Sequence, residues 1–182
     1  MNVRRSEPWR VVLIGPECTG KTWLAQDLAS LYGVPWSEEY ARLFVEEHPR
    51  PVVYDDVDPI GIGQRAGEDE ALAQARRAGA RVVIHDTDLV STAVYSRHYY
   101  GDCPAWIEAA AYARRADLYL LHQVDVPWVA DGQQRVDPAR RIELFARFRD
   151  TLAALRTTVV EIGGVWEERR RAAIEAVDGL RR

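Results

Sequence analysis

The chain has 182 residues, of which 47% are hydrophobic and 29% are charged, and its formal net charge is −4. This length and balance are typical of a globular protein, so we expect residues 1–182 to form a single domain around one core. A slightly acidic chain lacks the positive charge of a dedicated nucleic-acid-binding protein. No apolar run approaches the roughly 20 residues of a membrane span, and residues 1–10 lack the apolar stretch of a secretion signal. We therefore expect a cytoplasmic protein without a nucleic-acid or membrane partner.

Apolar runs bounded by turn residues predict strands that alternate with helical segments. The strands are expected at 11–14, 34–37, 82–85, 118–121 and 159–162, and the helices at 21–32, 60–78, 105–115, 138–155 and 166–177. This alternation predicts an α/β fold, a five-stranded parallel sheet with helices on both faces in three layers. Residues 50–59, rich in proline and acids, are expected to form a mobile loop on the substrate side. Because ligands of such sheets lie beyond the carboxyl ends of the strands, functional groups are sought just after each strand.

The first strand is followed by a phosphate-binding loop. Residues 15–22, Gly-Pro-Glu-Cys-Thr-Gly-Lys-Thr, match the pattern G-x-x-x-x-G-K-[ST] between a strand and a helix. Backbone N–H groups and the helix N-terminus of such a loop bind phosphate oxygens. The one lysine of the chain, Lys21, stands where this pattern needs a compact charge at the β- and γ-phosphates. The loop therefore predicts ATP binding and the three-layer P-loop kinase fold. Contacts to ATP are expected from Gly15, Glu17, Cys18, Thr19, Gly20, Lys21, Thr22 and Trp23.

Two acids follow the buried strand at 82–85. P-loop proteins place the carboxylate that holds Mg²⁺ at such a position, so Asp86 and the hydroxyl of Thr22 are the predicted metal ligands. Asp88 is a second catalytic candidate. The alternative for Asp88 or Thr87 is to cap a helix that begins at Leu89.

A further acidic pair, Glu38 and Glu39, follows the short second strand. A carboxylate at this position could orient or deprotonate the hydroxyl of an acceptor, and Glu39 is the candidate. The alternative is that both acids favour the N-terminus of a helix. The general base therefore stays open between Glu39, Asp86 and Asp88.

The polar loop at 125–135, followed by Arg140 and Arg141, is expected to form a lid. An arginine carried by a closing loop can stabilise the charge of the transferred phosphoryl group. Arg135 is the first candidate for this catalytic role and Arg141 the second. The alternative is that both are ordinary surface arginines.

Taken together, these segments resemble the ribosylnicotinamide kinase domain of the NadR-type P-loop proteins, an AAA-type ATPase and NadR kinase family. The resemblance covers most of the chain. It is carried by the phosphate loop and by the segments 35–36, 39–42, 86–89, 100–104, 106–107, 117–121, 126–129 and 131–132. It implies transfer of the ATP γ-phosphate to the 5′-hydroxyl of nicotinamide riboside, with Mg²⁺, giving nicotinamide mononucleotide in NAD salvage. Residues 133–135 depart from the family pattern.

The acceptor implied by this resemblance carries a cationic pyridinium ring, which favours aromatic faces and a nearby carboxylate. Core packing is the alternative for each aromatic residue. Two further functions also remain open, namely a kinase of another nucleoside or small alcohol and an ATP-binding regulatory switch. Substrate contacts are expected from Trp36, Glu39, Tyr40, Asp88, Tyr95 and Trp128, and adenine is expected beside residues 163–166. The oligomeric state is left open.

Overall fold

The computed structural model describes residues 7–126 and 138–180. Its centre is a sheet of five strands in the order β2-β3-β1-β4-β5, and every neighbouring pair is parallel. The strands are β1 (Trp9–Ile14), β2 (Trp36–Ser37), β3 (Val82–Asp86), β4 (Leu118–His122) and β5 (Thr158–Ile162). The helices are α1 (Lys21–Tyr32), α2 (Tyr40–Glu47), α3 (Val57–Arg77), α4 (Leu89–Tyr100), α5 (Ala105–Ala113), α6 (Pro138–Leu155) and α7 (Trp166–Leu180). The predicted α/β fold with a five-stranded parallel sheet is confirmed.

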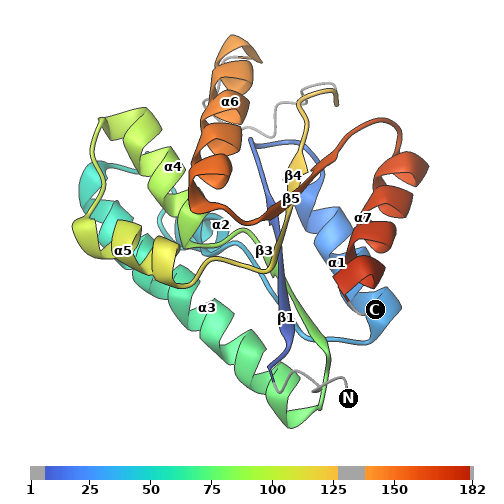
Figure 1. Ribbon diagram of the computed structural model, residues 1–182. Coiled ribbons are helices and arrows are strands. Elements are labelled where there is room, and N and C mark those ends of the chain that lie inside the picture. The colour runs from blue at the N-terminus through green and yellow to red at the C-terminus, as the bar shows by residue number, and fades with distance from the viewer. Residues whose placement is uncertain (1–6, 127–137, 181–182) are drawn as a thin grey trace.

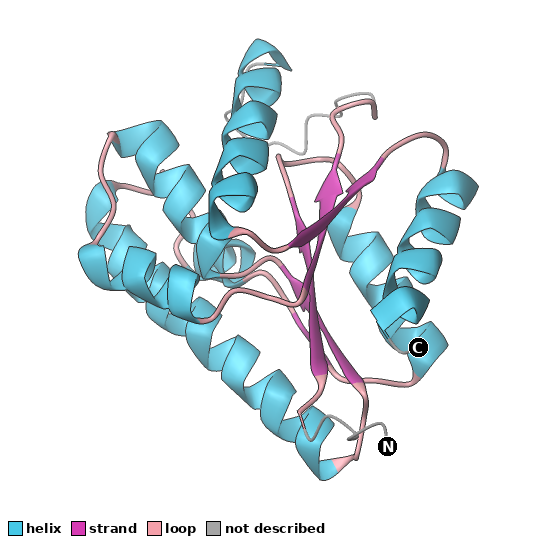
Figure 2. Ribbon diagram, in the orientation of Figure 1, coloured by secondary structure: helices cyan, strands magenta, loops and turns pink. Residues whose placement is uncertain are grey.

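Helices cover both faces of the sheet (Figure 1). Because side chains alternate along a strand, Val11 and Leu13 of β1 pack toward α1 and α7, whereas Val12 and Ile14 pack toward α4, α5 and α6. Helix α3 covers β3 on the latter face through Ala71, Ala75 and Val83. Figure 2 shows the resulting helix, sheet and helix layers. No helix within the described ranges is long and apolar enough to cross a membrane.

The strand register brings two distant parts of the chain together. Leu13 of β1 pairs with Asp86 of β3, so the segments that follow both strands leave the sheet at the same edge. The loop after Ile14 therefore begins beside Asp86. This edge is where the strand order predicts that ligands bind.

Residues 50–59 are ordered by one acid, which corrects the prediction of a mobile loop there. They form a 3₁₀ turn (Tyr54–Asp56) and the first residues of α3. Both oxygens of Asp56 accept from the guanidinium of Arg50, at 2.6 and 2.7 Å, and Oδ2 also accepts from the Val53 N–H at 2.9 Å. Three charge-assisted hydrogen bonds fix the backbone of this segment.

Candidate active site

The phosphate loop approaches β4 so closely that it requires glycine at its first position. Gly15 has φ +135°, and a Cβ atom there would lie 2.9 Å from the carbonyl oxygen of His122. Gly20, with φ +83°, precedes the first residue of α1 and is left-handed as well. Both conformations are costly for other residues. The pattern of glycines is therefore explained by the backbone of this site.

Carbonyl groups of the phosphate loop are held by donors that surround it. The carbonyl of Pro16 accepts from Lys21 Nζ at 2.8 Å and from Thr19 Oγ1 at 2.9 Å. The carbonyl of Thr19 accepts from the Arg169 guanidinium at 3.3 Å, and His122 Nδ1 lies 3.0 Å from it. Since a carbonyl can only accept, Nδ1 of His122 carries the proton. Burial lowers the pKa of His122 to about 3, so this histidine is neutral at pH 7.

Arg141 of α6 also reaches the loop. It is buried, and its guanidinium donates to the carbonyl of Cys18 at 3.3 Å and to that of Val126 at 3.5 Å. This second lid candidate thus lies against the phosphate loop, while its role in transfer stays a prediction. The first candidate, Arg135, and the predicted substrate contact Trp128 lie outside the described residues.

The turn between β5 and α7, where adenine is expected, is tied to the same loop. Asp125 accepts from the Gly164 N–H at 2.6 Å and forms an ion pair with the buried Arg169. Arg169 donates in addition to the carbonyl of Gly164 at 2.8 Å. One arginine therefore connects the end of β4, this turn and Thr19.

The two predicted metal ligands meet directly. The Thr22 hydroxyl donates to Asp86 Oδ2 at 2.6 Å. Within the part of the chain that the structure describes, Oδ1 of the fully buried Asp86 has no hydrogen-bond partner. Burial raises the pKa of Asp86, against the opposing effects of Lys21, of the bond from Thr22 and of Arg42. Arg42 of α2 lies 3.5 Å from the same hydroxyl. A buried, unpartnered carboxylate oxygen beside a hydroxyl fits a hard cation such as Mg²⁺.

A cavity of about 520 Å³ adjoins this site between α2, α3 and α4. Its size suits a small organic ligand. Half-buried Glu39 lines it, and the pKa of Glu39 is raised to about 7, first by desolvation and then by the negative charges of Asp86 and Glu17, while Lys21 and Arg42 act in the opposite direction. A carboxylate with this pKa can accept a proton near neutral pH. Tyr95 and Glu17 also line the cavity.

Three predicted ligand contacts lie elsewhere. Trp36 packs with the core residues under α1 and α7. The ring of Tyr40 lies over Gly63 of α3, where a Cβ atom would be 2.2 Å from it. Trp23 is 76% exposed on α1. None of the three lines the cavity. The rings of Trp36 and Tyr40 pack within the fold, and the predicted ligand contacts of all three residues stay predictions.

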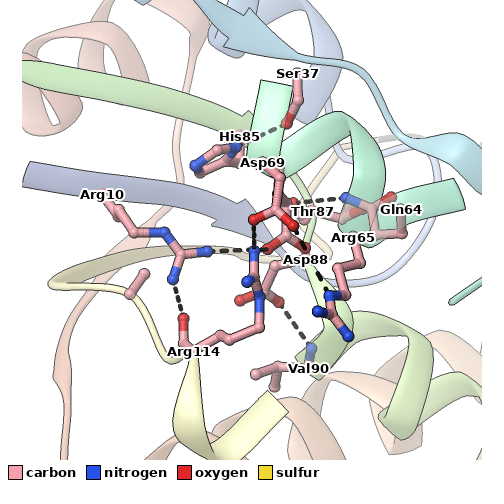
Figure 3. A network of polar contacts seen from close by, with 12 residues as sticks. Arg10, Ser37, Gln64, Arg65, Asp69, His85, Thr87, Asp88, Val90 and Arg114 are labelled. Carbon is pink, nitrogen blue, oxygen red and sulfur yellow. Dashed lines mark hydrogen bonds and ion pairs between the residues drawn. The ribbon is translucent and has the colours of Figure 1, made fainter. Parts of the chain in front are cut away.

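Asp88 caps α4, as its alternative interpretation held. Its Oδ1 accepts from the N–H groups of Val90 at 3.0 Å and Ser91 at 3.4 Å, and its Oδ2 accepts from the Tyr119 hydroxyl at 2.7 Å. Figure 3 shows the bond to Val90 inside a dense polar network. Burial raises the pKa of Asp88, and its carboxylate does not line the cavity. The structure thus shows that Asp88 positions α4, and its catalytic and substrate-binding roles stay predictions.

Gln64 of α3 was not predicted as a functional residue, although it connects two functional segments. Its Oε1 accepts from the Tyr40 N–H at 3.0 Å, and its Nε2 donates to the carbonyl of Thr87 at 3.3 Å (Figure 3). Tyr40 follows Glu39, and Thr87, whose φ is +64°, follows Asp86. A signal was present, because Gln64 lies on the buried stripe of α3. A polar residue at an apolar position of a helix indicates a buried hydrogen-bonding task.

A cluster of ion pairs lies beside this network. Arg10 of β1 donates to Glu68 at 2.9 Å, and Arg114 contacts Glu68 at 3.3 Å and Asp69 at 2.6 Å (Figure 3). Desolvation and the nearby Asp88 raise the pKa of the buried Glu68 to about 7. The two arginines oppose this rise. This cluster joins β1, α3 and the end of α5 beneath the site.

Comparison with known proteins identifies a family model and two relatives that match this chain. A family model described as an AAA domain matches residues 10–169. The trifunctional NAD biosynthesis/regulator proteins NadR of Salmonella typhimurium and Escherichia coli are each 32% identical over 126 residues. These matches cover 67% of this chain and 30% of each relative, so the chain spans less than a third of their length.

Solved structures agree in fold. The crystal structure of a NadR protein in complex with NR has a TM-score of 0.71 at 25% identity, covering 94% of this chain and 51% of that one. A deoxyadenosine kinase from M. mycoides with bound dATP has a TM-score of 0.62 at 10% identity and covers 93% of this chain and 99% of its own, a likeness of fold alone. With its phosphate loop and with a family match from residue 10 to residue 169, the chain belongs to the AAA-domain family and is a relative of the NadR proteins.

Proposed function

We propose that this chain is an ATP- and Mg²⁺-dependent kinase that phosphorylates the 5′-hydroxyl of nicotinamide riboside and releases nicotinamide mononucleotide and ADP. The observation that carries the proposal is the 520 Å³ cavity beside the phosphate loop, lined by Glu39 and Tyr95. A cavity with a candidate base at one side and aromatic walls suits a nucleoside whose hydroxyl must approach the γ-phosphate.

Phosphate binding is assigned to the loop at 15–22. Its backbone N–H groups and Lys21 would bind the phosphate oxygens of ATP. Thr22 and Asp86 would hold Mg²⁺, because Asp86 Oδ1 is buried without a partner and the Thr22 hydroxyl lies against the same carboxylate. When bound, the ion neutralises charge on the β- and γ-phosphate oxygens.

The reaction assigned to the cavity is an in-line displacement. The acceptor hydroxyl oxygen forms a bond to the γ-phosphorus, the bond from that phosphorus to the β–γ bridging oxygen breaks, and ADP leaves. The proton of the hydroxyl goes to the carboxylate of Glu39, whose pKa of about 7 matches this task near neutral pH. Arg42, 3.5 Å from the Thr22 hydroxyl, is near enough to contribute positive charge on the phosphate side.

Nicotinamide riboside is proposed as the acceptor for two reasons. A NadR protein whose structure matches 94% of this chain was crystallised in complex with NR. The cavity of this chain also combines tyrosines with carboxylates, which favour a cationic ring. The catalytic roles of Lys21, Glu39 and Asp86 remain part of this proposal. So do the catalytic role of Arg135 and the substrate contact of Trp128, both outside the described residues.

The first experiment measures ADP release from Mg²⁺-ATP with a panel of nucleosides and identifies each product by mass. The expected result is selective formation of nicotinamide mononucleotide, together with loss of transfer in Lys21→Ala while the circular dichroism spectrum stays that of the wild type. Selective transfer to another nucleoside would correct the acceptor. ATP hydrolysis that ignores every acceptor would contradict the kinase assignment and favour a regulatory ATPase.

A further inference from the structure

Glu17 stands in the phosphate loop, but its side chain belongs to the acceptor cavity. The half-buried carboxylate lines this cavity together with Glu39 and with Tyr95 and Tyr99 of α4. The Tyr99 hydroxyl donates to Glu17 Oε1 at 3.4 Å, and Tyr95 also interacts with this carboxylate. Among the described residues, the buried Oε2 has no hydrogen-bond partner. The side chain is thus fixed at one oxygen and leaves the other without a partner. The predicted contact of Glu17 with ATP is therefore assigned to its backbone.

No positive side chain in the described ranges forms an ion pair with this carboxylate. None of the ion pairs within residues 7–126 and 138–180 includes Glu17. Two arginines line the cavity, but Arg50 is bound by both oxygens of Asp56, and Arg42 is directed to the Thr22 hydroxyl. A negative charge is therefore left over at the wall of the cavity.

The neighbouring groups respond to this charge. The negative charge of Glu17 contributes to the raised pKa values of Tyr95, Tyr99 and Glu39, after burial as the main cause. A buried carboxylate oxygen without a partner carries a cost in free energy that a positively charged ligand would offset. Phosphate groups of ATP would instead be repelled by it.

We infer that Glu17 is a specificity-determining residue that selects an acceptor with a cationic ring over a neutral one. This inference rests on the proposed function and adds the residue that recognises the charge of the acceptor. The partnerless oxygen of Glu17 supplies the opposite charge, and the rings of Tyr95 and Tyr99 supply the aromatic wall against which a pyridinium ring is stabilised.

A second use of the carboxylate, accepting a hydrogen bond from a ribose hydroxyl, leads to a different result. The nicotinamide riboside cation and its neutral 1,4-dihydro form share the ribose and the carboxamide, and they differ in the charge of the ring. Recognition of a hydroxyl would therefore favour both acceptors equally. Recognition of charge favours the cation alone.

The test compares kcat/KM for these two acceptors in the wild type, Glu17→Gln and the matched control Glu38→Gln, which removes an exposed charge outside the cavity. The wild type is expected to prefer the cation, and Glu17→Gln is expected to reduce the ratio of the two kcat/KM values by about 10-fold or more, the order of one charge pair in a partly buried site. Glu38→Gln is expected to leave the ratio unchanged. Glu17→Asp, which keeps the charge, should retain most of the preference.

Equal losses with both acceptors in Glu17→Gln would overturn the inference, as would a raised KM for ATP as the dominant effect. Binding to the wild type gives an independent measurement that needs no variant to fold. Tighter binding of the cation supports the inference, and equal affinities for the two forms overturn it. Wild-type turnover of neither riboside would instead show that the proposed function is wrong, and the inference would fall with it.

Discussion

The hydroxyl of Thr22 and the carboxylate of Asp86 are 2.6 Å apart, although 64 positions separate them in the chain. Thr22 is the second residue of α1, and Asp86 is the last residue of β3. Their contact follows from the pairing of β1 with β3, which places the start of the phosphate loop beside Asp86. The two residues predicted to hold Mg²⁺ are thus in contact.

Asp86→Asn is predicted to lower kcat by about 100-fold or more, because it removes the negative charge opposite the ion while preserving shape. Additional Mg²⁺ should restore little of this loss. Initial rates over a range of Mg²⁺ concentrations would measure it, with Asp150→Asn on the exposed side of α6 as a control of equal charge change. A variant with wild-type kcat would remove Asp86 from the metal site.

Glu39→Gln is predicted to lower kcat by about 100-fold or more, as loss of a general base commonly does. The pKa of Glu39 is raised to about 7, so the carboxylate is the minor form below that pH and kcat/KM of the wild type should rise as the pH increases through about 7. Glutamine does not titrate, and the variant should lose this limb of the profile. An unchanged profile would assign the base elsewhere.

Asp88→Asn separates capping from catalysis. Asparagine is as good a helix cap as aspartate, so the bonds to Val90 and Ser91 can persist while the charge is lost. If Asp88 only positions α4, kcat should stay within about 10-fold of the wild type, below the usual effect of losing an acid or base. The melting temperature should fall, because the Tyr119 hydroxyl loses a charged acceptor. A much larger loss of kcat at normal stability would restore the catalytic role.

Gln64→Met is predicted to slow the reaction without weakening the binding of ATP. The change leaves the Tyr40 N–H and the Thr87 carbonyl without their partner, which costs about 1–3 kcal/mol of stability for each buried group left unsatisfied. Glu39 and Asp86 would lose their fixed spacing, so kcat should fall while KM for ATP changes little. Gln74→Met, at an exposed position of the same helix, is the control. Equal effects in the two variants would contradict the positioning role.

Asp56 predicts a stability effect in acid. Its hydrogen bonds to Arg50 and Val53 lower its pKa from 3.8 to about 2. A lowered pKa in the folded state means that the ionised form stabilises the fold above pH 3.8 and that this contribution is lost as the pH falls toward about 2. Asp56→Asn should cost about 1 kcal/mol at neutral pH, since Arg50 is half exposed. Thermal melts against pH, with the exposed Asp55→Asn as control, would measure both effects; identical acid curves would refute this assignment.

The fold was largely predictable because buried parallel strands are short apolar runs, and all five were found within two residues at each end. Two helices were missing from the predicted set, although the alternative role of Asp88 or Thr87 implied a helix that begins at Leu89. α4 is rich in β-branched and aromatic residues that favour helices weakly, and its formation depends on the cap from Asp88 and on packing. α2 has only 8 residues, too few for a clear periodic signal.

The candidate site also has a part that could be predicted from the sequence and a part that could not. The phosphate loop and Asp86 were predictable, because their roles follow from backbone geometry and from position at a strand end. The wall of the cavity was not, because it depends on side-chain directions from three helices. Trp36 and Tyr40 were correctly placed near the site along the chain, but their rings pack into the fold. Sequence spacing cannot decide which way such a ring turns.

The hydrogen bonds that hold the carbonyl groups of the phosphate loop also affect the binding of ATP. The described chain has no cis peptide bond, so fixing a carbonyl fixes the following N–H in the opposite direction. Arg169 and His122 hold the carbonyl of Thr19, and Arg141 holds that of Cys18, which sets the N–H groups of Gly20 and Thr19 before any phosphate arrives. The loop is therefore ordered when the protein folds, and ATP binding does not have to supply the free energy of ordering it. Helices α6 and α7, although remote in sequence, act as parts of the nucleotide site.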